Sequence, residues 1–161
     1  MIIIDSKTVE QTKVEVGCLM QPEQANIAGN IHGGEVLKLM DNSAGIVASR
    51  HAGSNVVTAR VDRVEFHYPI HIGNFVNCKS KMTFVGRSSM EVSVTVLVED
   101  VFKDEEPKVA LTGYFTFVAL DSDGKPRVVP SLEITNEEEQ KIYDESQKRY
   151  MEFKKYKNNI E

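Results

Sequence analysis

The chain has 161 residues, of which 41% are hydrophobic and 27% charged, so it is long enough for one globular domain with a sizeable core. A formal net charge of -5, with no dense basic run before the C-terminal tail, argues against general nucleic-acid binding but leaves room for a local basic site for an anionic small molecule. The two cysteines, Cys18 and Cys78, are too few for a disulfide scaffold and lack metal-ligand spacing, so we expect both to be reduced, with Cys78 on the inner face of a strand.

The N-terminal part of the sequence predicts a strand followed by a loop. The apolar run at residues 1–4 is too short for a secretory signal or a membrane span, which makes the cytoplasm the expected location. Residues 8–16 alternate well enough to predict a first, partly exposed strand. Residues 17–31, which include Pro22 and Gly29, are expected to form an ordered loop.

A long helix is predicted from about residue 33 to residue 51, ending at a glycine-containing stop signal. At about 100° per residue, its apolar side chains fall on one arc: Val36, Leu37, Met40, Ala44, Val47, Ala48 and His51. Asp41 lies at the edge of this arc, next to small residues that let another backbone approach. Because acids are rarely buried without a partner, Asp41 is a candidate functional residue.

The loop before this helix carries polar groups suited to binding a developing negative charge. The pair Gly33 and Gly34 at the helix start would present N–H groups at the positive end of the helix dipole, with no side chain in the way. A carbonyl oxygen that acquires negative charge would be stabilised there. Asn26 and His32 add further hydrogen-bonding groups. Taken alone, the glycines would be explained as well by a tight turn.

Beyond the helix the hydrophobic period changes to two. Residues 56–61 predict a strand whose apolar phase shifts before residue 64, which indicates a bulge near residues 62–63. Further strands are predicted in the remaining alternating segments, which are residues 76–84, 90–98 and 109–120. One buried helix with one strand before it and four after it predicts an α+β domain, in which an antiparallel sheet curls around a single long helix.

A second helix is predicted from Thr135 onwards. Thr135 and Glu138 fit a capping box, and the acidic residues come first and the lysines last, as the helix dipole favours. Its apolar stripe of Tyr143, Tyr150 and Phe153 is narrow. We therefore expect a surface helix that docks on the domain or on a neighbouring subunit, without a catalytic role.

Several blocks of the sequence, in order, resemble the acyl-coenzyme A hydrolase group of the hotdog superfamily. The matching blocks are residues 22–26 (PEQAN), 29–34 (GNIHGG), 39–41 (LMD), 57–62 (VTARVD), 86–92 (GRSSMEV) and 124–126 (GKP). The resemblance covers roughly residues 8–130, which we take as the hotdog domain, and leaves residues 131–161 as a charged helical tail. It implies a hotdog fold, pairing into dimers, and commonly a trimer of dimers.

The resemblance also implies an enzyme that hydrolyses fatty acyl-CoA to free fatty acid and CoA. Active sites in such dimers lie between subunits, so Asn26 of one chain would act with Asp41 of the other, and Thr58 matches a third catalytic position. Asp41 would be the general base for water, or a nucleophile that forms a mixed anhydride. Asn26 and Thr58 would orient the water, and the N–H groups near Gly33 and Gly34 would hold the oxyanion.

CoA is a polyanion, so an acidic protein needs local cations to bind it. The turn formed by Arg87, Ser88 and Ser89 offers one positive charge and two hydroxyl donors, which suit phosphate, and Lys125 and Arg127 are weaker candidates. No cofactor is expected besides the CoA of the substrate and product. His67 and His71 flank a turn but lack a third ligand, so we expect no metal site.

Two alternative functions remain on the sequence alone, because a fold does not fix a function. Hydratases and dehydratases with this fold rely on a histidine base near the helix, whereas Asn26 cannot accept a proton and His32 adjoins the glycine pair. A non-catalytic acyl-CoA sensor would be expected to carry an output module and would have little need for Asp41.

Overall fold

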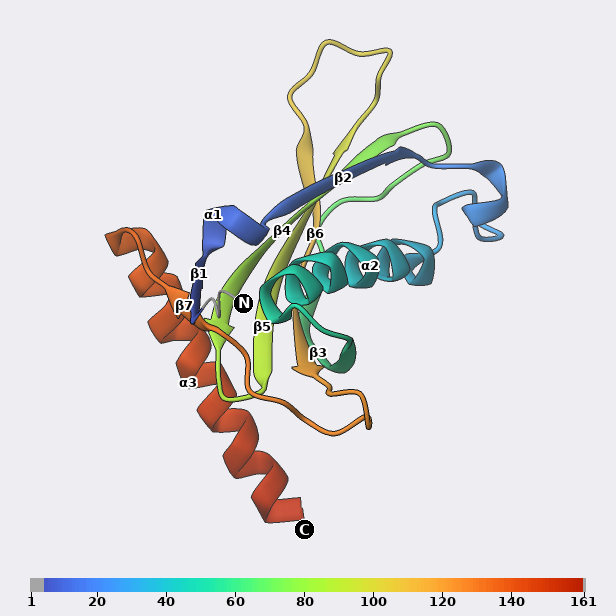
Figure 1. Cartoon of the computed structure of the whole chain (residues 1–161). Coiled ribbons are helices and arrows are strands. Elements are labelled where there is room, and N and C mark those ends of the chain that lie inside the picture. The colour runs from blue at the N-terminus through green and yellow to red at the C-terminus, as the bar shows by residue number, and fades with distance from the viewer. Residues whose placement is uncertain (1–4, 161) are drawn as a thin grey trace.

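The computed structural model describes residues 5–160, so the apolar run at residues 1–4 lies outside the described part. A five-stranded antiparallel sheet packs against one long helix, α2 (Gly33–Ala52) (Figure 1). The strands, in sheet order, are β2 (Val14–Leu19), β4 (Phe75–Val85), β5 (Ser89–Glu99), β6 (Lys108–Ala119) and β3 (Val56–Phe66). The predicted α+β arrangement is confirmed. No helix within residues 5–160 has the length and apolar character needed to cross a bilayer.

The core lies between α2 and the inner face of the sheet. Met40, Ala44 and Val47 of α2 are fully buried there. They pack with inward-facing residues of the central strands, among them Met90, Val92, Val94, Val96 and Phe115. Cys78 is buried on β4 as predicted, and burial raises the pKa of its thiol to about 12.

The C-terminal end of α2 matches the sequence prediction. Gly53 terminates the helix in the left-handed conformation at φ 64°, which a glycine adopts without steric cost. Two residues earlier, His51 is fully buried and its Nε2 lies 2.7 Å from the carbonyl oxygen of Pro130. Burial lowers the pKa of His51, so the neutral ring donates its N–H to this carbonyl and ties the helix end to the later chain.

Strand β3 forms one edge of the sheet and pairs with β6 alone. The predicted bulge is confirmed: the register shifts between Asp62 and Glu65, and Arg63 has a φ of 50°. A second shift, between Thr58 and Arg60, was not predicted.

The prediction of a strand over residues 8–16 is wrong in its first half. A short β1 (Ser6–Thr8) leads into one helical turn, α1 (Val9–Thr12), before β2 begins at Val14. Thr8 caps this turn: its hydroxyl accepts from the N–H of Gln11 at 3.3 Å, and the Gln11 side chain accepts from the N–H of Thr8 at 2.8 Å. This reciprocal capping box overrides the alternating pattern. The following loop contains one short 3-10 turn, η1 (Pro22–Gln24).

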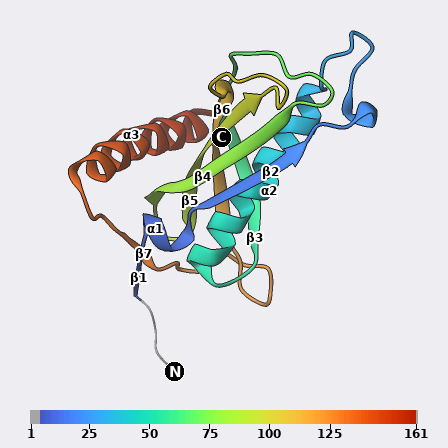
Figure 2. The same ribbon diagram turned by 90° about the horizontal axis from the view of Figure 1, so that it is seen from above.

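The C-terminal segment returns to the sheet on the face opposite α2. Strand β7 (Ser131–Glu133) pairs in parallel with β1, and α3 (Glu137–Ile160) follows. The sheet lies between α2 and α3 (Figure 2). The expected docking on the domain is confirmed, because Tyr143 and Tyr150 pack against Phe84 of β4 with ring centroids 5.1 and 5.0 Å away.

The start of α3 is capped differently from the prediction. The side chain of Asn136, not Thr135, accepts from the backbone N–H of Glu139 at 2.8 Å. The carboxylate of Glu139 accepts from the N–H and the hydroxyl of Thr135, at 2.9 and 3.0 Å. The predicted capping box of Thr135 with Glu138 is therefore wrong by one residue in register. The polar run TNEEE offers both registers, and Asn is at least as good a cap as Thr.

Candidate active site

Asp41 and Thr58 meet where α2 crosses the edge strand β3. The Thr58 hydroxyl donates to Oδ1 of Asp41 at 2.7 Å. Asp41 is half-buried, whereas Thr58 is exposed because β3 is the edge of the sheet. The chain thus provides a carboxylate that is oriented by a hydroxyl donor and is still accessible from the side where β3 has no neighbour.

Asn26 lies in a tight turn ahead of α2. Its backbone N–H donates to the carbonyl of Asn30 at 2.7 Å, and its Oδ1 accepts from the N–H of Asn30 at 3.2 Å. Gly29, at φ 86°, closes the turn by donating to the Asn26 carbonyl at 3.0 Å. Within residues 5–160, the amide NH₂ of Asn26 has no acceptor, so this exposed side chain is fixed through its oxygen and can donate to a ligand.

Asn26 and Gly33 line the same open hollow at the start of α2, together with Phe66 and Tyr68. Gly33 is the first residue of the helix, and the N–H groups of the first helical turn have no carbonyl acceptor within the helix. The N–H of Gly34 donates to Nδ1 of its neighbour His32 at 3.3 Å, so His32 serves as the helix cap. Of the two glycines, Gly33 is therefore the one whose N–H can meet a ligand.

Sequence reasoning did not single out Phe66. A Cβ on Gly33 would lie 3.1 Å from the Phe66 ring, so any side chain at position 33 would displace that ring. The alternation of apolar residues at the end of β3 was the only sequence signal, and it does not indicate a contact with α2.

Within one chain, the Asn26 end and the Asp41 end of the site are separate. Asp41 lies eight residues after Gly33, which places it about 12 Å further along the helix axis. Thr58 accompanies Asp41, and Asn26 accompanies Gly33. Each chain thus carries two partial sites of complementary chemistry: a carboxylate with its orienting hydroxyl, and a pair of N–H donors.

The turn between β4 and β5 holds the predicted phosphate-binding side chains. It closes with a bond from Gly86 N–H to Ser89 O at 2.8 Å. The carbonyls of Arg87 and Ser88 accept from the N–H groups of Val129 and Ala119, at 3.0 and 2.9 Å. With its backbone tied to the protein, the turn leaves the side chain of Arg87 exposed, and within residues 5–160 that side chain has no ion-pair partner.

Of the two weaker phosphate-binding candidates, Arg127 is connected to this turn and Lys125 is not. The N–H of Arg127 donates to Ala119, the same residue that donates to Ser88. Lys125 lies in a separate turn that is closed by Asp121. Within residues 5–160, the structure contains no group of three or more His, Cys, Asp or Glu side chains that could hold a metal ion. The Nε2 of His67 lies 3.0 Å from the Thr112 hydroxyl.

Comparisons with known proteins agree with this geometry. A family model described as the thioesterase superfamily matches residues 28–101. A mouse cytosolic acyl coenzyme A thioester hydrolase is 37% identical over 151 residues, covering 93% of this chain; the chain spans 40% of the length of that relative. A solved acyl-CoA hydrolase from Staphylococcus aureus, in complex with butyryl coenzyme A and coenzyme A, is 33% identical with a TM-score of 0.87, over 96% of this chain and 94% of its own. A hexameric acyl-CoA thioesterase is 35% identical with a TM-score of 0.88, over 95% and 97% of the two chains.

The S. aureus protein has also been solved as three single alanine variants, at an asparagine, an aspartate and a threonine. These three residues are separated by 15 and 17 positions in that protein, as are Asn26, Asp41 and Thr58 here. The likeness to solved relatives at about one third identity over more than nine tenths of both chains, together with the hotdog arrangement of helix and sheet, leads to one conclusion: the chain belongs to the acyl-CoA thioester hydrolases of the thioesterase superfamily.

Proposed function

We propose that the protein hydrolyses the thioester of fatty acyl-CoA, releasing a free fatty acid and CoA in the cytosol. The observation that carries the proposal is the 2.7 Å hydrogen bond from Thr58 to the half-buried carboxylate of Asp41. It is supported by the family, by the likeness to the mouse cytosolic acyl coenzyme A thioester hydrolase and by the matching spacing of the three altered residues in the S. aureus protein.

In this mechanism Asp41 is the general base. Thr58 donates to Oδ1 and thereby fixes the plane of the carboxylate, which leaves Oδ2 to accept a proton from the attacking water. The N–H of Gly33 and the amide of Asn26 polarise the thioester carbonyl and stabilise the oxyanion. The CoA thiolate then leaves. Direct attack by Asp41 to form a mixed anhydride is the competing route, and rapid-quench mass spectrometry of Asp41-containing peptides distinguishes the two by the presence of an acyl-enzyme.

The two partial sites of one chain become two complete sites when two chains pair along β3. This edge strand runs for 11 residues and exposes the apolar side chains of Val57 and Val61, which are 43% and 47% accessible. A long, apolar, unpaired edge is a liability unless another chain covers it. In the proposed dimer, a two-fold contact along β3 would bring Asn26 and Gly33 of one chain against Asp41 and Thr58 of its partner.

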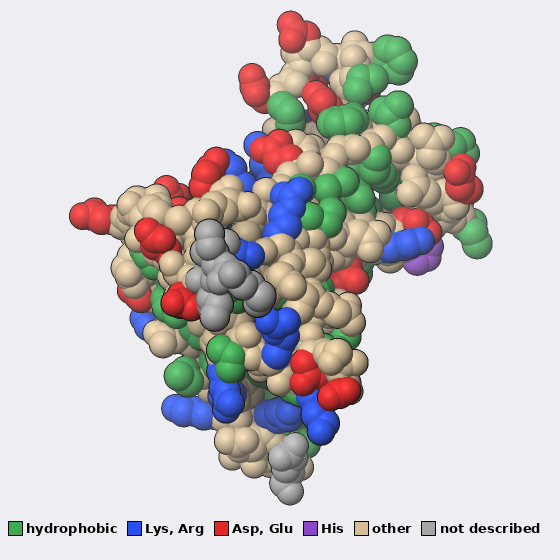
Figure 3. All heavy atoms as spheres, in the orientation of Figure 1, with side chains coloured by type: hydrophobic (Ala, Val, Ile, Leu, Met, Phe, Trp, Pro, Cys, Tyr) green, Lys and Arg blue, Asp and Glu red, His purple; other side chains and the backbone are tan. Residues whose placement is uncertain are grey.

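A second apolar surface supports assembly beyond the dimer. Exposed apolar side chains of three segments gather at one end of the molecule, at the upper right of Figure 3. These segments are the loop before α2, the end of β3 with the β3–β4 connection, and the β5–β6 hairpin, with Ile27, Phe66, Tyr68, Ile72, Val101 and Phe102. Contiguous apolar patches on a protein surface mark interaction sites. We infer a trimer of dimers, an assembly that has the six subunits of the hexameric relative.

The activity is tested by measuring thiol release from a panel of acyl-CoAs of increasing chain length. We expect release without added metal or cofactor and no effect of EDTA. Asp41→Asn should lower kcat by at least about 10², the lower range for loss of a general base, while the protein stays folded. A folded wild-type sample that releases no thiol from any acyl-CoA would sink the hydrolase and favour the non-catalytic acyl-CoA sensor. Hydration of a 2-enoyl-CoA without thiol release would favour the hydratase.

The shared site is tested by mixing two inactive variants. When unfolded Asn26→Ala and Asp41→Ala chains are refolded together, half of the dimers are heterodimers, and each of these has one site with both groups intact. About a quarter of the wild-type activity should therefore return. Sites built within one chain would give no recovery, because every site would lack one group. Exchange of subunits is verified by native mass spectrometry of the same sample.

A further inference from the structure

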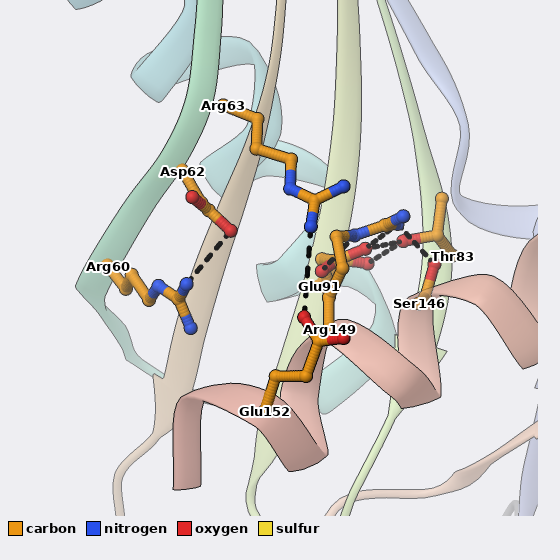
Figure 4. Close-up of polar contacts among 8 residues, drawn as sticks. All are labelled: Arg60, Asp62, Arg63, Thr83, Glu91, Ser146, Arg149 and Glu152. Carbon is orange, nitrogen blue, oxygen red and sulfur yellow. Dashed lines mark hydrogen bonds and ion pairs between the residues drawn. The ribbon is translucent and has the colours of Figure 1, made fainter. Parts of the chain in front are cut away.

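The C-terminal helix α3 lies on the outer face of the sheet and is fixed there by a buried ion pair. Arg149 of α3 donates to both oxygens of Glu91 on β5, at 2.8 and 3.4 Å (Figure 4). The same guanidinium donates to Ser146 at 2.8 Å and stacks 3.9 Å above the Tyr114 ring. Arg149 and Glu91 are 9% and 7% exposed. The helix therefore has a definite position relative to the start of β5.

The C-terminal half of α3 and the sheet enclose a groove that reaches the predicted phosphate-binding turn. Ser89, the last residue of that turn, forms part of its lining. From α3 come Tyr150, Phe153, Lys154 and Lys157, and from the sheet come Arg60, Asp62 and Glu91. The hollow measures about 190 Å³, which is less than the roughly 300 Å³ or more of a site for a whole drug-sized ligand. It is suited to one end of a long substrate.

The groove carries positive charge that its own acidic side chains do not balance. Its two acids are already neutralised: Asp62 pairs with Arg60 at 2.9 Å, and Glu91 pairs with Arg149. Lys154 and Lys157 form no ion pair within residues 5–160. In a chain with a net charge of -5, these two lysines form a local cationic site for a polyanion, in a groove that Ser89 of the predicted phosphate-binding turn also lines.

The walls between these cations are aromatic and apolar. Phe153 packs under the Arg60 guanidinium at 3.8 Å, and Tyr150 packs against Phe84. Tyr150 also reaches the turn itself, because its hydroxyl lies 3.5 Å from the position that a Cβ on Gly86 would take. A ligand that combines phosphates with a flat ring fits this lining, and the nucleotide of CoA is such a group.

We propose that α3 forms one wall of the CoA nucleotide site, with Lys154 and Lys157 as phosphate-binding residues together with the turn that holds Arg87 and Ser89. This rests on the proposed function, because it assigns a position to the distal end of that substrate. The helix that sequence reasoning treated as a passive surface element thus takes part in substrate binding.

The test compares two double variants with the same change in charge. Lys154→Met/Lys157→Met removes the groove cations, and Lys141→Met/Lys148→Met removes two exposed lysines of the same helix. By helical geometry Lys148 lies about 180° from Lys157, on the opposite face. Exposed substitutions of this kind are tolerated by folds, so both variants should be folded. Lys154→Arg/Lys157→Arg keeps the charge and should behave like the wild type.

The groove variant should raise KM for acyl-CoA about 5-fold at low salt with little change in kcat, and the difference should shrink as salt screens the lysines. The control pair should leave KM unchanged. For acyl-pantetheine, which lacks the nucleotide, neither pair should change KM. Equal KM for acyl-CoA in the groove and control variants, or an equal rise with acyl-pantetheine, would overturn the proposal.

Titration calorimetry with CoA keeps this test separate from catalysis. A wild type that binds CoA but releases no thiol would refute the hydrolase, while weaker CoA binding by the groove variant alone would still support the wall formed by α3. Unchanged CoA affinity in the groove variant would refute the role of α3 in CoA binding, whatever the activity.

Discussion

Removing one member of the buried pair between Glu91 and Arg149 should strongly destabilise the protein. In Arg149→Met the aliphatic stem is kept, but the Glu91 carboxylate loses its two nitrogen donors and stays buried, with a side-chain exposure of 8%. Breaking such a pair on one side costs about 3–5 kcal/mol. For a chain of this length that corresponds to a fall in Tm of roughly 10 °C.

Removing both members should restore most of that loss. In Glu91→Leu/Arg149→Met no charge is left buried, and Thr83, which donates to the Glu91 side chain at 2.8 Å, keeps its bond to the Glu91 backbone carbonyl at 3.0 Å. Replacing a buried ion pair by apolar groups of similar volume is often neutral or stabilising. Burial alone would lower the pKa of Arg149, but its hydrogen bond to Glu91 together with the charges of Glu91, Tyr114 and Glu145 outweighs burial, so the pKa is raised and Arg149 stays charged.

The assay is urea unfolding of the wild type, both single variants and the double variant at one protein concentration, because assembly shifts apparent stability. We expect a large favourable coupling between Glu91 and Arg149 in the double-mutant cycle. A cost below about 1 kcal/mol for Arg149→Met, the range of an exposed pair, would refute a stabilising buried pair, as would a double variant no more stable than the single ones.

Three further outcomes are expected. Arg87→Ala should raise KM for acyl-CoA with a smaller effect on kcat, as when binding common to the ground and transition states is lost, and acyl-pantetheine kinetics is the control. Burial lowers the pKa of His51 below the ordinary value of 6.5, so on acidification the unfolded chain takes up a proton at this residue at a higher pH than the folded chain does. The stability that the neutral, buried His51 contributes is therefore complete above about pH 6.5 and is lost as the pH falls below it. His51→Gln keeps a donor for Pro130 and cannot titrate, so its urea midpoint should fall less than that of the wild type between about pH 7.5 and 5.5. Cys78, with its pKa raised to about 12, should not react with thiol reagents until the protein unfolds, and modification of Cys78 in the native state would contradict its burial.

Local sequence patterns were sufficient wherever a single element determines its own ends. The period of 3.6 and Gly53 predicted α2 to within a residue, and the phase shift in β3 predicted the bulge at Arg63. They failed where two local signals compete. At Thr8 a capping box with Gln11 forms a helical turn inside an alternating segment, and in α3 the cap moves from Thr135 to Asn136.

The candidate site was only partly readable for a different reason. Asp41 stood out because it is an acid beside an apolar stripe, but its hydrogen bond to Thr58 depends on β3 lying beside α2, which follows from pairing with the distant β6. The local sequence does not indicate that β3 lies beside α2, and Thr58 was predicted as a site residue only from the family resemblance. The ion pair that fixes α3 joins residues 58 positions apart and leaves no periodic trace, so the groove was not predicted.

The two faces of the sheet divide the proposed substrate between them. Along β5, Met90 faces α2 and the core, while the adjacent Glu91 faces α3, so neighbouring residues of one strand support the two layers. The turn at residues 86–89, tied to Ala119 on one side and beside Tyr150 on the other, is where the layers meet. A thioester end bound near α2 and a nucleotide end bound under α3 therefore share little of their lining. Substitutions in the α3 wall should consequently act on KM and those at Asp41 on kcat, and their effects should be independent, because distant sites without common partners contribute additively.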